Sequence, residues 1–183
     1  MKITGGSLKG RVIPGRVPPG VRPTPARVRE ALFSMLGQEL DGVVALDPFC
    51  GSGLLSFEAL SRGAAASVLL DANPRVVQQV RAAARALGLS DRVTARVGRF
   101  PKGLPVERRF DLILLDPPYA LDPGPILAAV APLARGLVVL ETAARTEVIA
   151  PEGLRLVDRR RYGDTALTLL EAVGAPAPAP PPP

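Results

Sequence analysis

The sequence Asp116-Pro-Pro-Tyr119 offers hydrogen-bond acceptors and almost no donors. An ionised aspartate only accepts, and proline has a carbonyl but no N–H. The complementary partner is a primary amine on a planar ring. Its two N–H groups would bind the carboxylate of Asp116 and the carbonyl of Pro117 or Pro118, while Tyr119 stacks on the ring. The motif therefore predicts a site that receives an exocyclic amine.

An amine held in this way directs its nitrogen lone pair toward an electrophile. With a methyl sulfonium in line, positioning supplies much of the rate, and Asp116 stabilises the positive charge that moves onto nitrogen. This chemistry needs no imidazole, and the chain contains no histidine. The alternative is that the motif only ends a strand before a helix. A separate helix cap at Asp122, followed by Pro123, weakens that alternative.

A second candidate site is the glycine turn Asp47-Pro-Phe-Cys-Gly-Ser-Gly53, between a predicted strand and a predicted helix. Glycines at such a turn let a ligand approach the backbone closely. The turn lacks the third glycine of a dinucleotide-binding fingerprint. A carboxylate at Asp47 would repel a pyrophosphate, but it would attract an ammonium group near a sulfonium. Two glycines in a turn are also compatible with ordinary loop geometry.

Asp71 ends the next predicted strand, twenty residues after Gly51. In doubly wound sheets an acid at this position accepts hydrogen bonds from two ribose hydroxyls. The alternative role is to cap the helix that begins at Pro74, for which Asn73 is better placed. We favour ribose binding for Asp71. We expect the glycine turn, Asp71 and the Asp116 motif to converge on one crevice at the carboxyl ends of parallel strands.

Alternating strand and helix patterns position these residues. Continuous apolar strands separated by helical patterns are typical of a parallel sheet that is buried on both faces. The predicted strands are 43–46, 67–70, 93–97, 110–115 and 136–140, and the predicted helices are 26–36, 53–62, 74–87 and 123–134. Two more strands, joined around Tyr162-Gly-Asp164, are predicted to form a hairpin that adds an antiparallel strand to the edge of the sheet.

Length and composition exclude several classes of protein. A chain of 183 residues is the size of one domain. No run approaches the ~18 to 20 apolar residues of a membrane span, and no apolar signal segment follows the N-terminus, so we expect a cytoplasmic protein. The single cysteine excludes an internal disulfide. The lack of histidine removes Ser-His-Asp triads and the commonest zinc ligand, and we expect no metal.

Positive charge is concentrated near the N-terminus. The formal net charge is +6, and no acid precedes Glu30. Such a segment is typical of proteins that bind nucleic acid, because neutralisation of the phosphates supplies most of the non-specific affinity for nucleic acid. A solvated charge run or compositional bias would give the same pattern. We divide the chain into a basic arm at 1–25, a catalytic domain at 26–171 and a disordered Pro/Ala tail at 172–183.

Several stretches resemble known methyltransferases. DPFCGSG, the acid of LLDANP and DPPY are similar to the motifs of Rossmann-like S-adenosylmethionine-dependent methyltransferases that modify exocyclic amines. ITGGSLKGRVIP, RPTPARVREALFSML, FEALSRGAA and RRYGDTALTLL resemble the RsmD family of bacterial small-subunit ribosomal RNA guanine-N2 methyltransferases. DPPY is shared with adenine-N6 enzymes and specifies only the class of chemistry, so the N-terminal stretches are what narrow the family.

The resemblance implies an α/β, Rossmann-like methyltransferase fold, with a mostly parallel seven-stranded sheet whose last strand is antiparallel, plus a short basic N-terminal extension. It also implies S-adenosylmethionine as methyl donor and 16S rRNA within the small ribosomal subunit as substrate. With the residues argued above, the candidate catalytic residues are Asp116, Pro117, Pro118 and Tyr119; the cofactor-binding residues are Thr24, Asp47, Phe49, Gly51, Gly53, Asp71 and Phe100; and the RNA-binding residues are Lys9, Arg11, Arg22 and Arg27.

The chain departs from such enzymes at one point. They often carry an acid after the third strand, near the adenine amine, whereas this chain has Val97-Gly-Arg-Phe100. We therefore expect adenine to be held by the backbone and by Phe100.

Two alternatives stay open. The same amino-methyl transfer could act on DNA adenine N6 or on a protein glutamine amide, but the protein-amide enzymes commonly carry Asn in place of the motif's acid, and a DNA enzyme would need a separate target-recognition region. A non-catalytic RNA-binding module would have basic residues without an intact cofactor site. We expect a monomer, because no element needs a partner to bury it.

Overall fold

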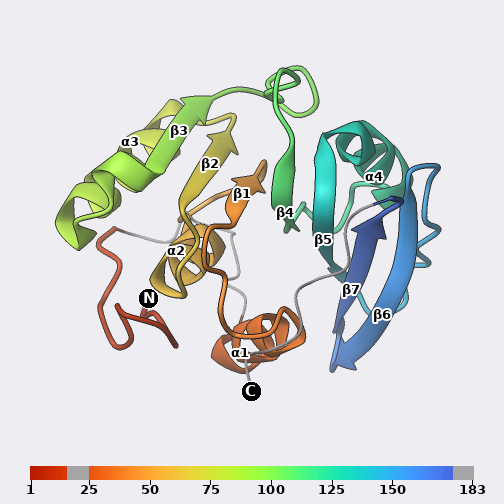
Figure 1. Ribbon diagram of the computed structural model, residues 1–183, viewed down its shortest axis with the longest axis horizontal. Helices are drawn as coiled ribbons and strands as arrows, with labels where there is room; N and C mark the ends of the chain where they lie inside the picture. Colours follow the sequence, from red (N-terminus) through yellow and green to blue (C-terminus); the bar gives the residue numbers. More distant parts are fainter. Residues whose placement is uncertain (16–24, 175–183) are drawn as a thin grey trace. The chain divides into compact units, whose positions relative to one another are not determined.

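The computed structural model describes residues 1–15 and 25–174 (Figure 1). Arg22, Thr24 and most of the predicted tail lie outside the described residues. Two compact units divide the chain, Met1–Pro105 and Val106–Pro183. The sequence did not predict this division.

The described strands form a seven-stranded sheet in the order β3-β2-β1-β4-β5-β7-β6. Strands β1 and β2, β2 and β3, and β4 and β5 pair in parallel, whereas β7 is antiparallel to both β5 and β6. The predicted α/β fold is therefore confirmed. The strands are β1 (Val44–Asp47), β2 (Ala66–Asp71), β3 (Val93–Val97), β4 (Phe110–Leu115), β5 (Ala134–Ala143), β6 (Leu154–Tyr162) and β7 (Thr165–Ala172).

The described residues of the first unit form three α-helices: α1 (Ala26–Met35), α2 (Leu54–Ser61) and α3 (Pro74–Leu87). Helix α2 packs against β1 and β2, and α3 packs against β2 and β3 (Figure 1). Every residue of α2 is buried. Helix α3 is amphipathic instead, begins after an Asn73 side-chain cap and ends at Gly88, where φ is 73°. These local stop signals explain why its predicted bounds match the structure.

Residues 1–13 form what we call the N-terminal hairpin. Lys2 and Val12 make an antiparallel bridge, and Ile3 and Ile13 are each 2% exposed. The Ser7 N–H donates to the carbonyl of Ser61 at the end of α2, 2.7 Å away. The predicted basic arm is thus, over its described part, a segment packed on α2, because its two isoleucines are core residues.

A buried ion cluster fixes the N-terminal hairpin to the two neighbouring helices. Glu58 of α2 is fully buried and accepts hydrogen bonds from the Thr4 N–H at 2.8 Å and the Thr4 hydroxyl at 2.9 Å. The same carboxylate pairs with Arg62, and it pairs with Arg29 of α1 at 3.4 Å. The Arg62 guanidinium also lies 4.3 Å from the centre of the Phe33 ring. One carboxylate therefore connects three segments that are distant in sequence.

The second unit contains helix α4 (Pro123–Val130), which gives way to a 3₁₀ turn at Ala131–Leu133. The predicted helix, 123–134, is therefore too long at its carboxyl end, because Pro132 has no N–H to donate to a continued helix. The predicted hairpin is confirmed, with β6 and β7 joined through Gly163 and Asp164. Strand β7 lies between β5 and β6, so the edge strand is β6, an order that the sequence did not predict.

Strand β6 is irregular and rich in arginine. Its pairing with β7 shifts register between Leu156 and Asp158. Arg155 pairs with Glu171 across the two strands, and Arg160 pairs with Asp158 at 2.8 Å. Strand β7 ends at Ala172, the first residue of the predicted tail. In the described part of the chain, no helix is long and apolar enough to cross a membrane.

Candidate active site

Asp47 lies at the end of β1, where it is 2% exposed. The Ser56 hydroxyl of α2 donates to Asp47 Oδ2 at 3.0 Å, and the Ser67 hydroxyl of β2 donates in turn to Ser56 Oγ at 2.9 Å. The buried Ser56 hydroxyl therefore binds Asp47 directly, and the buried Ser67 hydroxyl orients Ser56. Its negative charge acts on the turn through a region of low dielectric constant, where charge interactions are strong.

Asp71 connects the turns that follow β1 and β2. The Gly51 N–H donates to Asp71 Oδ2 at 3.2 Å, and the Asn73 N–H donates to Asp71 Oδ1 at 2.8 Å. Asn73 is the helix cap, because its side chain accepts from the Arg75 N–H at 2.9 Å. The interpretation that Asn73 caps α3 is confirmed. Each carboxylate oxygen of Asp71 has a second lone pair, so the ribose-binding role stays a prediction that this geometry permits.

The two predicted glycines of the turn have different roles. Gly53 has a φ of 75°, and a Cβ atom there would lie 2.9 Å from Phe57 Cε2 and 3.2 Å from Leu69 Cδ2. Gly51 has a φ of 49°, and a Cβ there would meet open space. Gly53 is thus required for packing inside the unit. Gly51 leaves its backbone open where a Cβ would stand, which the predicted close approach of a ligand requires.

Two predicted cofactor residues from separate loops meet in the first unit. The rings of Phe49 and Phe100 have centroids 4.8 Å apart and planes tilted by 34°. Both side chains are partly exposed. The loop that carries Phe100 starts at Gly98, whose N–H donates to the Asp71 carbonyl at 3.0 Å. Sequence reasoning missed this bond, which brings the loop after β3 against the end of β2.

Cys50 lies in the same turn and is buried. Burial raises the pKa of its thiol far above the ordinary value, and the neighbouring carboxylates of Asp47 and Asp71 raise it further. The thiol is therefore uncharged at neutral pH, and the nucleophilic thiolate does not form.

The substitution Asp71→Asn is expected to weaken S-adenosylmethionine binding about tenfold. The change removes the charge that strengthens a hydrogen bond to a ribose hydroxyl, and it replaces one acceptor with an N–H₂ donor. Isothermal titration calorimetry would measure the dissociation constant. Asp91→Asn is the matched control, because Asp91 is an exposed acid of the same unit. Equal affinities for Asp71→Asn and wild type would contradict the ribose-binding role.

In the second unit, the Asp116–Tyr119 segment follows directly after β4. Asp116 is partly exposed, Pro117 is buried, and Pro118 and Tyr119 are exposed. The Pro118 carbonyl accepts the Leu121 N–H at 2.9 Å. This bond occupies one acceptor site on Pro118, so the carbonyl of Pro117 is the better candidate to accept a substrate amine.

The alternative for the Asp116–Tyr119 motif was that it only ends a strand before a helix, and a separate cap at Asp122 was expected to start that helix. Asp122 performs that role, because its side chain accepts from the Gly124 N–H at 2.9 Å and Pro123 begins α4. The separate cap predicted from the sequence is confirmed. Asp116 is therefore not needed to start α4.

Tyr119 has a half-exposed ring, but its hydroxyl is bonded to two strands. The hydroxyl donates to Glu141 Oε1 of β5 at 3.1 Å and lies 2.9 Å from Thr165 Oγ1 of β7. Burial raises the pKa of Tyr119. The acidic side chains of Glu141 and Asp116 raise this pKa further, whereas the hydrogen bond with Thr165 lowers it. The net shift is upward, so the phenol keeps its proton at neutral pH. Sequence reasoning missed both partners, although Glu141 interrupts the apolar run LVVLETA.

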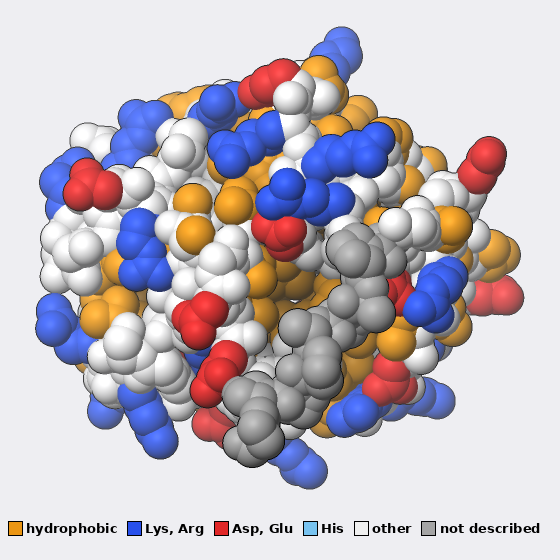
Figure 2. All heavy atoms as spheres, in the orientation of Figure 1, with side chains coloured by type: hydrophobic (Ala, Val, Ile, Leu, Met, Phe, Trp, Pro, Cys, Tyr) orange, Lys and Arg blue, Asp and Glu red, His pale blue; other side chains and the backbone are white. Residues whose placement is uncertain are grey.

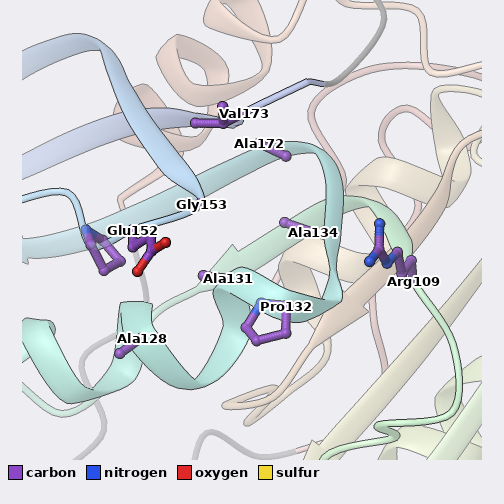
Figure 3. Close-up of a pocket in the computed structure, with 10 residues that line it drawn as sticks. Arg109, Ala128, Ala131, Pro132, Ala134, Glu152, Gly153, Ala172 and Val173 are labelled. Carbon is purple, nitrogen blue, oxygen red and sulfur yellow. The ribbon is translucent and has the colours of Figure 1, made fainter.

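A hollow of about 450 Å³ in the second unit is separate from this motif (Figure 3). Its lining includes Ala134 at the start of β5, Arg109 and Glu152. Ala134 pairs with Phe110 at the amino end of β4, whereas Asp116 follows the carboxyl end of that strand. The hollow therefore lies at the opposite end of β4 from the candidate catalytic residues.

The predicted RNA-binding residues that the structure describes are all exposed: Lys9, Arg11 and Arg27. Arg11 also donates to the Ala86 carbonyl near the end of α3, at 3.4 Å. Figure 2 shows Lys and Arg side chains spread over the visible face, with acidic side chains between them. The RNA-binding roles stay predictions, and the packed N-terminal hairpin limits how far Lys9 and Arg11 can move.

A family model described as "Conserved hypothetical protein 95" matches residues 1–171 of the chain. The chain belongs to this family. Among curated relatives, the Ribosomal RNA small subunit methyltransferase D of Haemophilus influenzae is 29% identical over 182 residues, covering 93% of each chain. The Escherichia coli K12 protein of the same name is 37% identical over 123 residues, or 65% of this chain and 60% of its own. The predicted membership of the RsmD family is confirmed.

Solved structures with the same fold support this family assignment. The Escherichia coli protein yhhF matches with a TM-score of 0.80 and 25% identity, covering 94% of this chain and 97% of its own. The Thermus thermophilus protein TTHA0928 matches with a TM-score of 0.74 and 31% identity, covering 92% and 98%. The chain is thus a methyltransferase by family and fold, and this assignment supports the predicted cofactor, S-adenosylmethionine.

Proposed function

We propose that this protein transfers a methyl group from S-adenosylmethionine to the exocyclic N2 amine of a guanine in the 16S rRNA of the small ribosomal subunit. The observation that carries the proposal is the Asp116–Tyr119 segment, where acceptors for an amine stand beside a half-exposed aromatic ring whose hydroxyl is fixed on two strands. The names of the curated relatives support rRNA as the substrate. We also propose that the enzyme acts as a cytoplasmic monomer.

The first unit supplies the cofactor residues. Gly51 leaves its backbone accessible, Asp71 adds a partly exposed carboxylate, and the Phe49–Phe100 pair offers an apolar surface for a planar base. When bound, S-adenosylmethionine supplies an electrophilic methyl group. A non-catalytic RNA-binding module would have no need for these residues, and their hydrogen-bonded arrangement argues against that alternative.

The second unit supplies the residues for the amine. Asp116 and the Pro117 carbonyl accept its two N–H groups, and the Tyr119 ring stacks on a base extruded from the RNA. The carboxylate of Asp116 favours the positive charge that develops on nitrogen as the methyl group arrives. As the lone pair of the amine forms the new N–C bond, the bond from the methyl carbon to sulfur would break and sulfur would keep its electron pair. The cationic nitrogen would then lose one proton to water, so no proton-transfer group is needed before the transfer.

The test is labelled methyl transfer to small subunits from a strain that lacks the endogenous enzyme. We expect label in 16S rRNA, and nuclease digestion followed by mass spectrometry to show N2-methylguanosine at one position. Naked 16S rRNA, DNA and ribosomal protein are the comparison substrates. Label in adenine N6 or in protein, with none in guanine N2, would replace the proposal with one of the alternative substrates.

A further inference from the structure

Glu141 and Thr165 come from different strands and approach Tyr119 from the same face of the sheet. In the β5–β7 pairing, Glu141 is opposite Leu167 and Thr165 is opposite Ala143. Side chains two residues apart on a strand share a face, so Glu141, Ala143, Thr165 and Leu167 point to one side. Glu141 and Thr165 are diagonal neighbours there, and the Tyr119 hydroxyl binds to both.

The direction of these hydrogen bonds follows from the number of protons. A phenol has one O–H proton, and Tyr119 donates it to the acceptor-only carboxylate of Glu141 at 3.1 Å. The Thr165 hydroxyl, 2.9 Å away, then donates to the phenol oxygen. Glu141 is 5% exposed, whereas the Tyr119 residue is 50% exposed. The far end of the ring is therefore held inside the unit while part of the ring faces solvent.

We propose that Glu141 and Thr165 are positioning residues that hold the Tyr119 ring in a fixed orientation for stacking on the target base. This inference rests on the proposed function. Fixing the ring before the base arrives reduces the conformational entropy that binding would otherwise cost. Because both hydrogen bonds involve the hydroxyl, the face of the Tyr119 ring stays available to stack on the target base. The inference also gives a role to the RRYGDTALTLL stretch, whose threonine at 165 makes one of the two bonds.

A double-mutant cycle tests the inference. Thr165→Val is expected to lower kcat/KM for small subunits about fivefold, the effect of one lost hydrogen bond, with S-adenosylmethionine affinity unchanged. Tyr119→Phe removes both hydrogen bonds and is expected to lower kcat/KM by more than Thr165→Val, again with S-adenosylmethionine affinity unchanged. The double variant should be no slower than Tyr119→Phe, because the phenol oxygen is already gone. Thr165→Ser should restore activity. Thr168→Val is the matched control on the same strand and should transfer at the wild-type rate.

A spectroscopic readout keeps the test independent of activity. The chain has two tyrosines and no tryptophan, so in a Tyr162→Phe background Tyr119 is the only tyrosine that contributes to the ultraviolet titration. Thr165→Val should raise the pKa of Tyr119 in an ultraviolet titration, because the phenolate loses a donor. Additive kinetic effects or an unshifted titration would overturn the inference. A shifted titration in a protein that transfers no methyl group would support the contact and overturn the proposed function.

Discussion

Asp116→Ala is expected to lower methyl transfer to small subunits by at least about 100-fold and to leave S-adenosylmethionine binding unchanged. The loss follows because the carboxylate both orients the amine and stabilises charge that appears only in the transition state. Cofactor binding is expected to survive because the residues assigned to it belong to the other unit. Single-turnover transfer of labelled methyl groups, with calorimetry of cofactor binding, measures both effects.

Asp111→Ala provides the control for this substitution, because Asp111 lies in β4, the strand that Asp116 directly follows. Asp111 forms a two-point ion pair with Arg135, with distances of 2.7 and 2.8 Å, and the Arg135 side chain is 52% exposed. Exposed pairs contribute little to stability, so this variant should transfer at close to the wild-type rate. Wild-type transfer by Asp116→Ala would contradict the proposed role of Asp116, whereas equal losses in both variants would indicate general damage to β4.

Glu58→Gln is expected to destabilise the first unit by about 3 to 5 kcal/mol. Glu58 is fully buried, and the substitution leaves the charges of Arg62 and Arg29 without their carboxylate in a region of low dielectric constant. The amide oxygen can still accept from Thr4 at the Oε1 position, but the N–H₂ group then faces Arg62, another donor, at the Oε2 position. Urea unfolding followed by circular dichroism would show a lower midpoint.

Glu39→Gln is the matched control for this stability measurement. It makes the same change of charge at an exposed position of the same unit, so its effect should stay within about 0.5 kcal/mol. If Glu58→Gln and Glu39→Gln unfold at the same urea concentration, the buried cluster does not hold the N-terminal hairpin as described.

The elements were predictable where local signals decide them. Strand β3 and helix α3 have the predicted bounds, since Asn73 and Pro74 start the helix and Gly88 ends it. The candidate residues at the ends of β1, β2 and β4 were also predictable from local sequence. A continuous apolar strand that ends at a polar residue can be recognised within a few residues.

The contacts that depend on pairs distant in sequence were not predictable. The N-terminal charges predicted a basic arm but gave no sign of its packing, because the buried partner of Thr4 is 54 residues away. At Gly6, where φ is 73°, an added Cβ would meet the Ser61 carbonyl, and no local pattern indicates that approach. Likewise, Glu141 and Thr165 reach Tyr119 only because β5 and β7 pair in one register.

The irregularity of β6 has a consequence for self-association. An edge strand with exposed apolar residues, here Leu156 and Val157, is a template for strand addition by another copy and hence for aggregation. The register shift beside these two residues breaks the regular hydrogen-bonding edge that an incoming strand would need. The incoming strand would also have to strip water from Arg155, Arg160 and Arg161. Positive charge, which near the N-terminus predicts nucleic-acid binding, would thus help on β6 to keep neighbouring copies of this protein apart.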